Sequence, residues 1–222
     1  MTWKNFFTSS IGKKYVMALT GLFLITFLVV HAGLNACIFL NDNGETFNAA
    51  AKFMSHNWIM RIVEIGLFAG LILHVIQGLM LWSQNRAARP VDYAVSKKQE
   101  NSKWYSRSMG LLGTLLLLFL IMHISHFWVG TKLELYGGRE THSLYAEMKE
   151  VFSEWYWVAL YMVGLVALFW HLFHGFQSAF QSLGLNHKKY FPIINTLGKA
   201  YSILIVILFA LMPLAFHFGW IE

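Results

Sequence analysis

Six histidines lie within long apolar stretches of this 222-residue sequence. Ionisable side chains are costly inside apolar segments, and by default they mark a function there. Neutral imidazole is a common metal ligand, and two imidazoles on opposite sides of an iron can hold a heme. Whether these histidines can pair depends on the depth of each one within its stretch. In chain order they are His31, His74, His123, His126, His171 and His174.

Depth can be counted along a helix, which rises about 1.5 Å per residue. His31 lies 17 residues after Lys14, and His123 lies 16 residues after Arg107. Both histidines are therefore roughly 25 Å from the ends of their helices that carry these basic residues. They are predicted to lie at one level, on the side of the membrane away from these basic residues. We call them the outer pair.

The second and fourth apolar stretches run in the opposite direction. His74 lies 13 residues after Arg61, and His171 lies 17 residues after Glu154. These two histidines are roughly 20–25 Å from the other side of the membrane. They form the inner pair. The count predicts two bis-histidine sites at two levels: His31 with His123, and His74 with His171.

Small residues beside the histidines would let a porphyrin approach the helix backbones. Gly70 and Gly78 lie one turn on either side of His74, and Gly175 lies one turn after His171. Such residues also serve ordinary close packing between membrane helices. Together with the four pairable histidines, they predict two hemes b, whose irons are held by the outer and the inner pair.

Two further histidines each follow a proposed ligand by three residues. His126 and His174 could be alternative ligands, partners of a heme propionate or a quinone, or hydrogen-bonded interior groups. His123 and His171 are preferred because their depths match those of their partners. No catalytic triad, phosphate-binding loop or zinc-like spacing occurs in the connections, so a cofactor would carry the chemistry. The remaining histidines are interpreted as surface or interfacial groups: His56, His142, His187 and His217.

Five apolar stretches must position these histidines, each near the ~20 residues that cross a bilayer core. The chain is 57% hydrophobic and 13% charged, whereas soluble domains are about a quarter charged. The stretches are apolar nearly all round instead of striped. The sequence predicts a single all-α transmembrane domain over residues 1–222, a polytopic five-helix bundle enclosing two hemes. Its helices are expected at 15–40, 58–82, 109–129, 155–180 and 200–218.

Basic residues are distributed unevenly between the two sides of this bundle. Of the 17 lysines and arginines, 12 fall at the N-terminus and the even connections, and 5 on the other side. Lysine and arginine are retained in the cytoplasm. We therefore expect a multi-pass protein of a bacterial inner (cytoplasmic) membrane, with the N-terminus cytoplasmic and the C-terminus outside. The basic excess indicates topology and a docking surface, with no role in binding nucleic acid. Residues 34–37 resemble a lipoprotein cleavage site, but the long first stretch is expected to remain uncleaved.

With these residues in place, the sequence resembles the diheme cytochrome b subunit of succinate dehydrogenases and menaquinol:fumarate reductases. The resemblance covers nearly the whole chain. The most specific stretch is Thr46–Trp82, TFNAAAKFMSHNWIMRIVEIGLFAGLILHVIQGLMLW. Other stretches that resemble ligand sites of the family are His31 to Asn35, Gly113 to His123, and Leu160 to Gly164 leading to His171 and Gly175.

This resemblance implies partners and a reaction that composition cannot show. The family's cytochrome anchors an FAD-containing flavoprotein and an iron–sulfur subunit on the cytoplasmic side of the lipid bilayer. Electrons pass in the respiratory chain between succinate or fumarate, on the partner chain, and a quinone, usually menaquinone, at this chain. The resemblance assigns the inner pair to the proximal heme b and the outer pair to the distal heme b. It makes the connection Arg86 to Arg107 the natural docking surface.

One position departs from the family pattern. Some fumarate reductases carry a glutamate two residues before the fourth-helix histidine, where this chain has Phe169. Proton return by that route is therefore in doubt. Glu64, the acidic residue within a span, is a candidate for protonating quinone near the outer side, or it caps a helix start close to Arg61. The quinone pocket is expected at the outer ends of the first four helices.

Two other functions compete with this interpretation. Cytochrome b subunits of hydrogenases and formate dehydrogenases also use intramembrane histidine pairs; the stretch Thr46–Trp82 favours the succinate:quinone enzymes. A transporter could use histidines as a proton relay without heme. Transporters usually have internal repeats and broken helices, and neither is evident in the sequence.

Overall fold

The computed structural model describes residues 9–88, 103–139 and 141–221, and in these ranges the regular structure is entirely helical. Five of the described helical segments are long and apolar enough to cross a membrane. The chain is therefore a multi-pass membrane protein. The spans are Ser10–Leu40 (α2, Ser10–Asn35, and a 3-10 turn), α4 (Trp58–Ala87), Met109–Tyr136 (α7, Met109–Ile124, a π segment and α8, Gly130–Tyr136), α10 (Trp155–Ser182) and α11 (Phe191–His217).

Three spans begin at the predicted residues Trp58, Met109 and Trp155, whereas α2 and α11 begin earlier than predicted. The Ser9 hydroxyl accepts from the backbone N–H of Gly12 at 3.0 Å, so α2 begins five residues before Tyr15. Pro192 occupies the first turn of α11 and places Lys199 inside that helix. Hydropathy marks the part of a helix in lipid, whereas caps mark its hydrogen-bonded ends.

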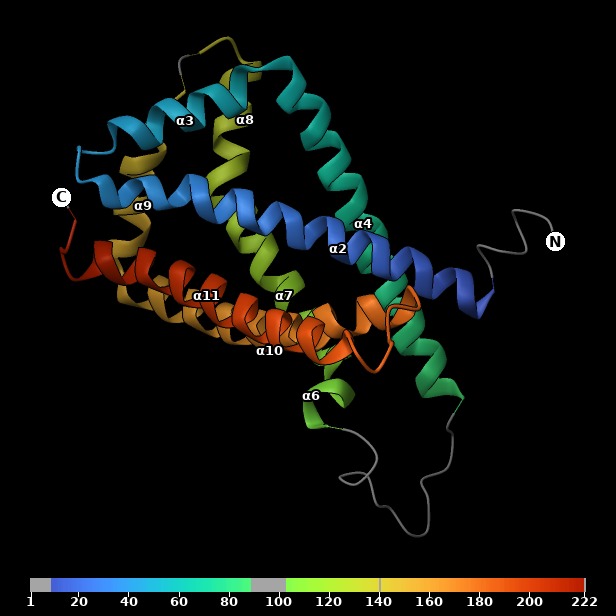
Figure 1. Cartoon of the computed structure of the whole chain (residues 1–222). Helices are drawn as coiled ribbons and strands as arrows, with labels where there is room; N and C mark the ends of the chain where they lie inside the picture. The colour runs from blue at the N-terminus through green and yellow to red at the C-terminus, as the bar shows by residue number, and fades with distance from the viewer. Residues whose placement is uncertain (1–8, 89–102, 140, 222) are drawn as a thin grey trace.

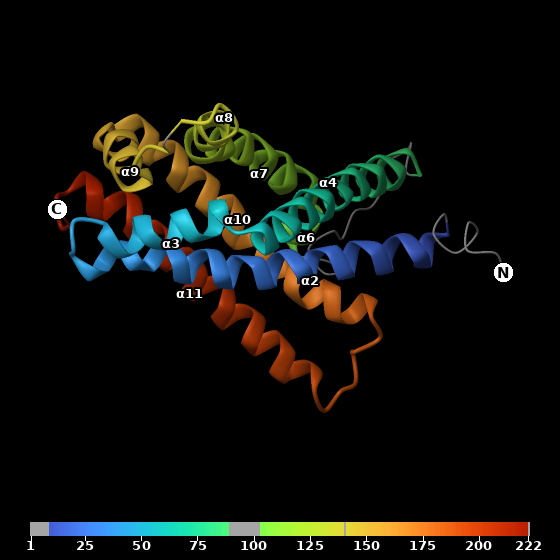
Figure 2. The same cartoon turned by 90° about the horizontal axis from the view of Figure 1, so that it is seen from above.

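Helix α10 is central to the bundle. It packs most extensively on α11 and also contacts α7 and α2, while α4 packs on α2 and α7. Figure 1 shows α2, α10 and α11 running alongside one another, with α4 and α7 crossing them. Figure 2 shows the same helices from above. None of the residues of α4 is buried, and Ile62, Ile65 and Ile72 are exposed. We infer that this helix faces lipid.

The third span was expected to end at Val129, but it continues to Tyr136. A π-helical segment, Ser125–Val129, joins α7 to α8 and carries His126. Short π segments inside α-helices are often found at functional sites. This segment lies immediately after the outer-pair residue His123 and immediately before the stretch that carries Lys132.

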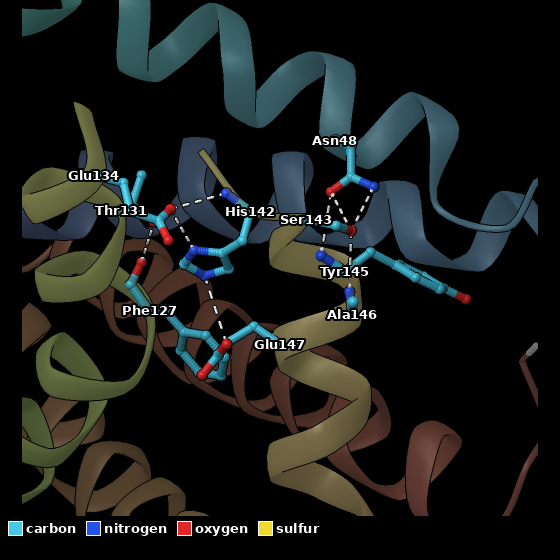
Figure 3. A network of polar contacts seen from close by, with 9 residues as sticks. All are labelled: Asn48, Phe127, Thr131, Glu134, His142, Ser143, Tyr145, Ala146 and Glu147. Atoms are coloured by element: carbon cyan, nitrogen blue, oxygen red, sulfur yellow. Dashed lines mark hydrogen bonds and ion pairs between the residues drawn. The ribbon is translucent and has the colours of Figure 1, made fainter. Parts of the chain in front are cut away.

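The connection between the first and second spans meets the connection between the third and fourth spans at the end of the bundle that carries the C-terminus (Figure 1). They contain the short helices α3 (Glu45–His56) and α9 (Leu144–Ser153). Asn48 of α3 donates to the hydroxyl of Ser143 at 3.0 Å, and the Tyr145 N–H donates to Asn48 at 3.2 Å. His142 binds Glu134 through its backbone N–H and Nδ1, at 2.9 and 2.7 Å. Figure 3 shows this network, which joins both connections on one side.

Candidate functional site

The structure places the four proposed ligands in the two predicted pairs. His31 of α2 contacts His123 of α7, with ring centroids 5.8 Å apart and planes at 89°. His74 of α4 contacts His171 of α10, with ring centroids 6.1 Å apart and planes at 66°. Each pair therefore joins two different spans, and all four spans that carry intramembrane histidines contribute one ring.

The separations within the pairs fit two ligands on opposite sides of one iron. A metal–imidazole bond of about 2 Å on each side, plus about 1.1 Å from each nitrogen to its ring centroid, gives centroids roughly 6.2 Å apart. Both observed distances lie within roughly half an ångström of that value. The described residues contain no group of three or more His, Cys, Asp or Glu side chains that could hold a metal ion. A heme iron needs only two protein ligands, because the porphyrin supplies the rest.

Hydrogen bonding in the pairs is incomplete. Nδ1 of His123 and Nδ1 of His171 are buried and have no hydrogen-bond partner. His31 Nδ1 lies 3.3 Å from the Asn35 amide, and His74 Nδ1 lies 3.2 Å from a hydroxyl of α2. Each pair thus has one ring with a polar partner and one without. A buried polar atom without a partner is costly, and it marks these two rings as ones whose polar groups the protein alone does not satisfy.

Aromatic rings surround the outer pair. His31 stacks on Phe27, with centroids 5.2 Å apart, and tilts against Phe209 at 5.6 Å. His123 stacks on Phe119 at 5.7 Å and meets Phe127 edge-on at 5.5 Å. These rings make an apolar setting that suits a flat macrocycle and excludes water.

Gly70 and Gly78 lie on the same face of α4 as His74, and this face packs on α2. A Cβ there would meet the ring of Phe23 at 3.0 Å and the Met17 methyl at 3.4 Å. These two glycines therefore serve close packing between α4 and α2. Two others face the inner pair. A Cβ on Gly21 would lie 3.4 Å from His74 Cε1, and one on Gly113 would lie 4.0 Å from His171 Cε1.

His126 and His174, whose roles the sequence leaves undecided, have other partners. His126 Nδ1 lies 3.2 Å from the hydroxyl of Tyr161, on whose ring it stacks, and it meets Trp157 edge-on at 4.6 Å. The ring of His174 lies 6.0 Å from that of Tyr105. Their neighbours are thus tyrosine and tryptophan rings, whereas each preferred ligand faces a histidine of another helix.

Glu64 does not cap a helix. Asn57 caps α4, accepting from two backbone N–H groups, and Arg61 donates to the hydroxyl of Tyr136 at 3.1 Å. Glu64 instead pairs with Lys132 of α8, whose Nζ lies 2.8 Å from its carboxylate, and accepts from the indole N–H of Trp128. Only 7% of Lys132 is exposed. The sequence-based interpretation assigned Lys132 to a connection, although an acid within a span requires such a partner.

A close contact behind the outer pair yields a test of its packing. A Cβ on Gly164 of α10 would collide with the ring of Phe119, which stacks on His123, whereas no atom lies within 4 Å of a Cβ on Gly175 of the same helix. We expect Gly164→Ala to lower the free energy of unfolding by about 1–3 kcal/mol through overpacking. Thermal unfolding in detergent measures this, with Gly175→Ala as the matched control. Equal midpoints for the two variants would contradict it.

Part of the expected docking surface, Arg86 to Arg107, lies outside the described residues, because residues 89–102 are not described. The Arg86 guanidinium, at its near edge, lies 5.9 Å from the centroid of the Trp82 ring. Chemically, the part of the chain that the structure describes offers two histidine pairs and a partly buried ion pair between Glu64 and Lys132. In comparison with known proteins, no family model, curated protein or solved structure matches this chain.

Proposed function

We propose that this chain is the heme b-containing membrane anchor of a succinate:quinone oxidoreductase. The observation that carries the proposal is the meeting of four intramembrane histidines from four spans as two pairs. Heme b supplies one-electron transfer when bound. His31 and His123 would hold the distal heme, and His74 and His171 the proximal heme.

The residues around each pair fit the task of holding such a group. Histidines from two helices would fix the position of an iron between them, and at the outer pair the surrounding phenylalanines keep water away. Because the pairs draw on different helices, the bundle can present two sites without a shared ligand. Two sites at different depths would carry electrons across the bilayer.

The proposed partners are an FAD-containing flavoprotein and an iron–sulfur subunit on the cytoplasmic side. The membrane would be a bacterial inner membrane, with the N-terminus of this chain in the cytoplasm and its C-terminus outside. The uneven distribution of basic residues supports that orientation. Succinate or fumarate would react on the flavoprotein. Electrons would be exchanged with a quinone in this chain, and the family resemblance implies menaquinone.

Glu64 remains the candidate residue for quinone protonation. Its carboxylate contacts Lys132 and Trp128. Lys132 belongs to α8, the end of the third span that leads into the connection expected on the outer side. A carboxylate held by a lysine inside a membrane is a suitable place for proton exchange with a quinol. Taking up a proton would neutralise the carboxylate and leave the Lys132 ammonium unpaired, so the pair favours a carboxylate that releases its proton again.

A cytochrome b subunit of a hydrogenase or formate dehydrogenase is the second candidate, because the histidine pairs fit it equally well. The stretch Thr46–Trp82 favours the succinate enzyme. The test is to purify the tagged chain from its host in mild detergent and add each electron donor in turn. We expect flavin and acid-labile sulfide to co-purify and succinate to reduce the heme. Reduction by formate or hydrogen, but not by succinate, would contradict the proposal.

A further inference from the structure

Thr20 of α2 lies against a proposed ligand of another helix. Its hydroxyl oxygen is 3.2 Å from His74 Nδ1, across 54 residues of sequence. The same hydroxyl lies 2.8 Å from the backbone carbonyl of Val16 and 3.3 Å from that of Met17. The Val16 carbonyl is the nearest acceptor and cannot donate, so we infer that it takes the single hydroxyl proton.

The direction of the hydrogen bond to the histidine follows. With its proton given to a carbonyl, the Thr20 oxygen can only accept from the ring, so Nδ1 of His74 carries the hydrogen. In the neutral ring, Nε2 then has a free lone pair, which is the form that binds a metal. Thr20 therefore selects the ligating tautomer of His74.

The other three proposed ligands lack this arrangement. Nδ1 of His123 and Nδ1 of His171 have no partner. Nδ1 of His31 faces the Asn35 side-chain nitrogen, which also donates to the His31 carbonyl at 2.8 Å. Among the four, His74 alone lies beside a hydroxyl whose proton is already engaged. Helix α2 can approach this closely because residue 21 is glycine, with His74 Cε1 3.4 Å from where its Cβ would be.

We propose that Thr20 is a positioning residue that fixes the tautomer of His74 and lowers the reduction potential of the heme held by the inner pair. This inference rests on the heme binding in the proposed function. A ligating histidine that donates its second N–H becomes more basic and favours the oxidised iron. Loss of the acceptor should therefore raise the potential of the inner heme and leave the outer one unchanged.

The test compares Thr20→Val with the unaltered full-length chain, by potentiometric titration of the reduced heme spectrum. Valine keeps the shape of threonine without its hydroxyl. We expect a rise in one of the two midpoint potentials, and Thr20→Ser should restore the original value. Thr26→Val is the matched control, because Thr26 of the same helix also bonds to the carbonyl four residues earlier, at 3.0 Å, and is exposed.

Selective loss of the inner heme in Thr20→Val, with a full complement in Thr20→Ser and Thr26→Val, would also support the positioning role. Two bound hemes with unchanged potentials in Thr20→Val would overturn it, as would equal shifts or heme losses in Thr26→Val. Absence of heme from the unaltered chain would instead contradict the proposed function. The two failures are therefore distinguishable.

Discussion

Replacing His74 or His171 with alanine is expected to remove the inner heme and leave the outer heme in place. Each proposed iron has two protein ligands, and the members of a pair lie on different helices. Loss of one imidazole leaves the iron with a single axial partner and opens the site to water. Replacing His31 or His123 should have the opposite selectivity. The heme content of the purified variants, with their redox spectra, measures the effect.

The matched controls are the histidines one turn further along. His126 and His174 belong to the same helical segments and face tyrosine rings. We expect His126→Ala and His174→Ala to keep both hemes. If His126→Ala removed a heme while His123→Ala did not, the assignment of the third-span ligand would be wrong. The same comparison between His174 and His171 tests the fourth span.

Replacing Lys132 with methionine is expected to destabilise the bundle by up to about 3 kcal/mol, because breaking a fully buried ion pair costs roughly 3–5 kcal/mol and Glu64 is only partly buried. The ammonium lies 2.8 Å from Glu64 and is almost fully buried between α8 and α4. Methionine fills a similar volume but removes the charge, so the carboxylate would be left within a span. Reversible unfolding in mixed detergent micelles measures the change in free energy.

A double-mutant cycle separates the pair from general packing. Glu64→Gln combined with Lys132→Met removes both charges, and it should recover much of the stability that the lysine variant loses. Arg61→Gln is the control at the same end of α4, because the Arg61 contact with Tyr136 is exposed and should contribute less than about 1 kcal/mol. A double variant as unstable as the sum of its single variants would show that the ion pair is not coupled.

The spans themselves could be predicted from composition, because a stretch of about 20 apolar residues has few alternatives to crossing the bilayer. The starts at Trp58, Met109 and Trp155 could also be predicted, but the other ends could not. Lys199 and Arg86 lie inside helices because hydrogen-bonded turns continue past the apolar core. The third span extends through a π segment to Tyr136, a continuation that no apolar run marks.

The histidine pairing could be predicted because depth in a membrane follows directly from residue count. Contacts across the bundle do not follow from such a count. Lys132 and Thr20 were missed as partners of Glu64 and His74 because the rotation of each helix about its own axis determines which side chains meet. Gly70 and Gly78 do share the face of His74, as their spacing predicts, but the spacing could not show that this face packs on Phe23 and Met17 of α2.

The most direct test of the two-level heme site is the heme content of the purified, unaltered chain. Pyridine hemochrome quantitation, combined with a dithionite-reduced minus oxidised spectrum, counts the hemes and identifies their type. We predict two hemes b per chain, one heme held by each histidine pair. A single heme would contradict the two-level pairing, and a chain purified without heme under conditions that supply it would contradict the heme function altogether.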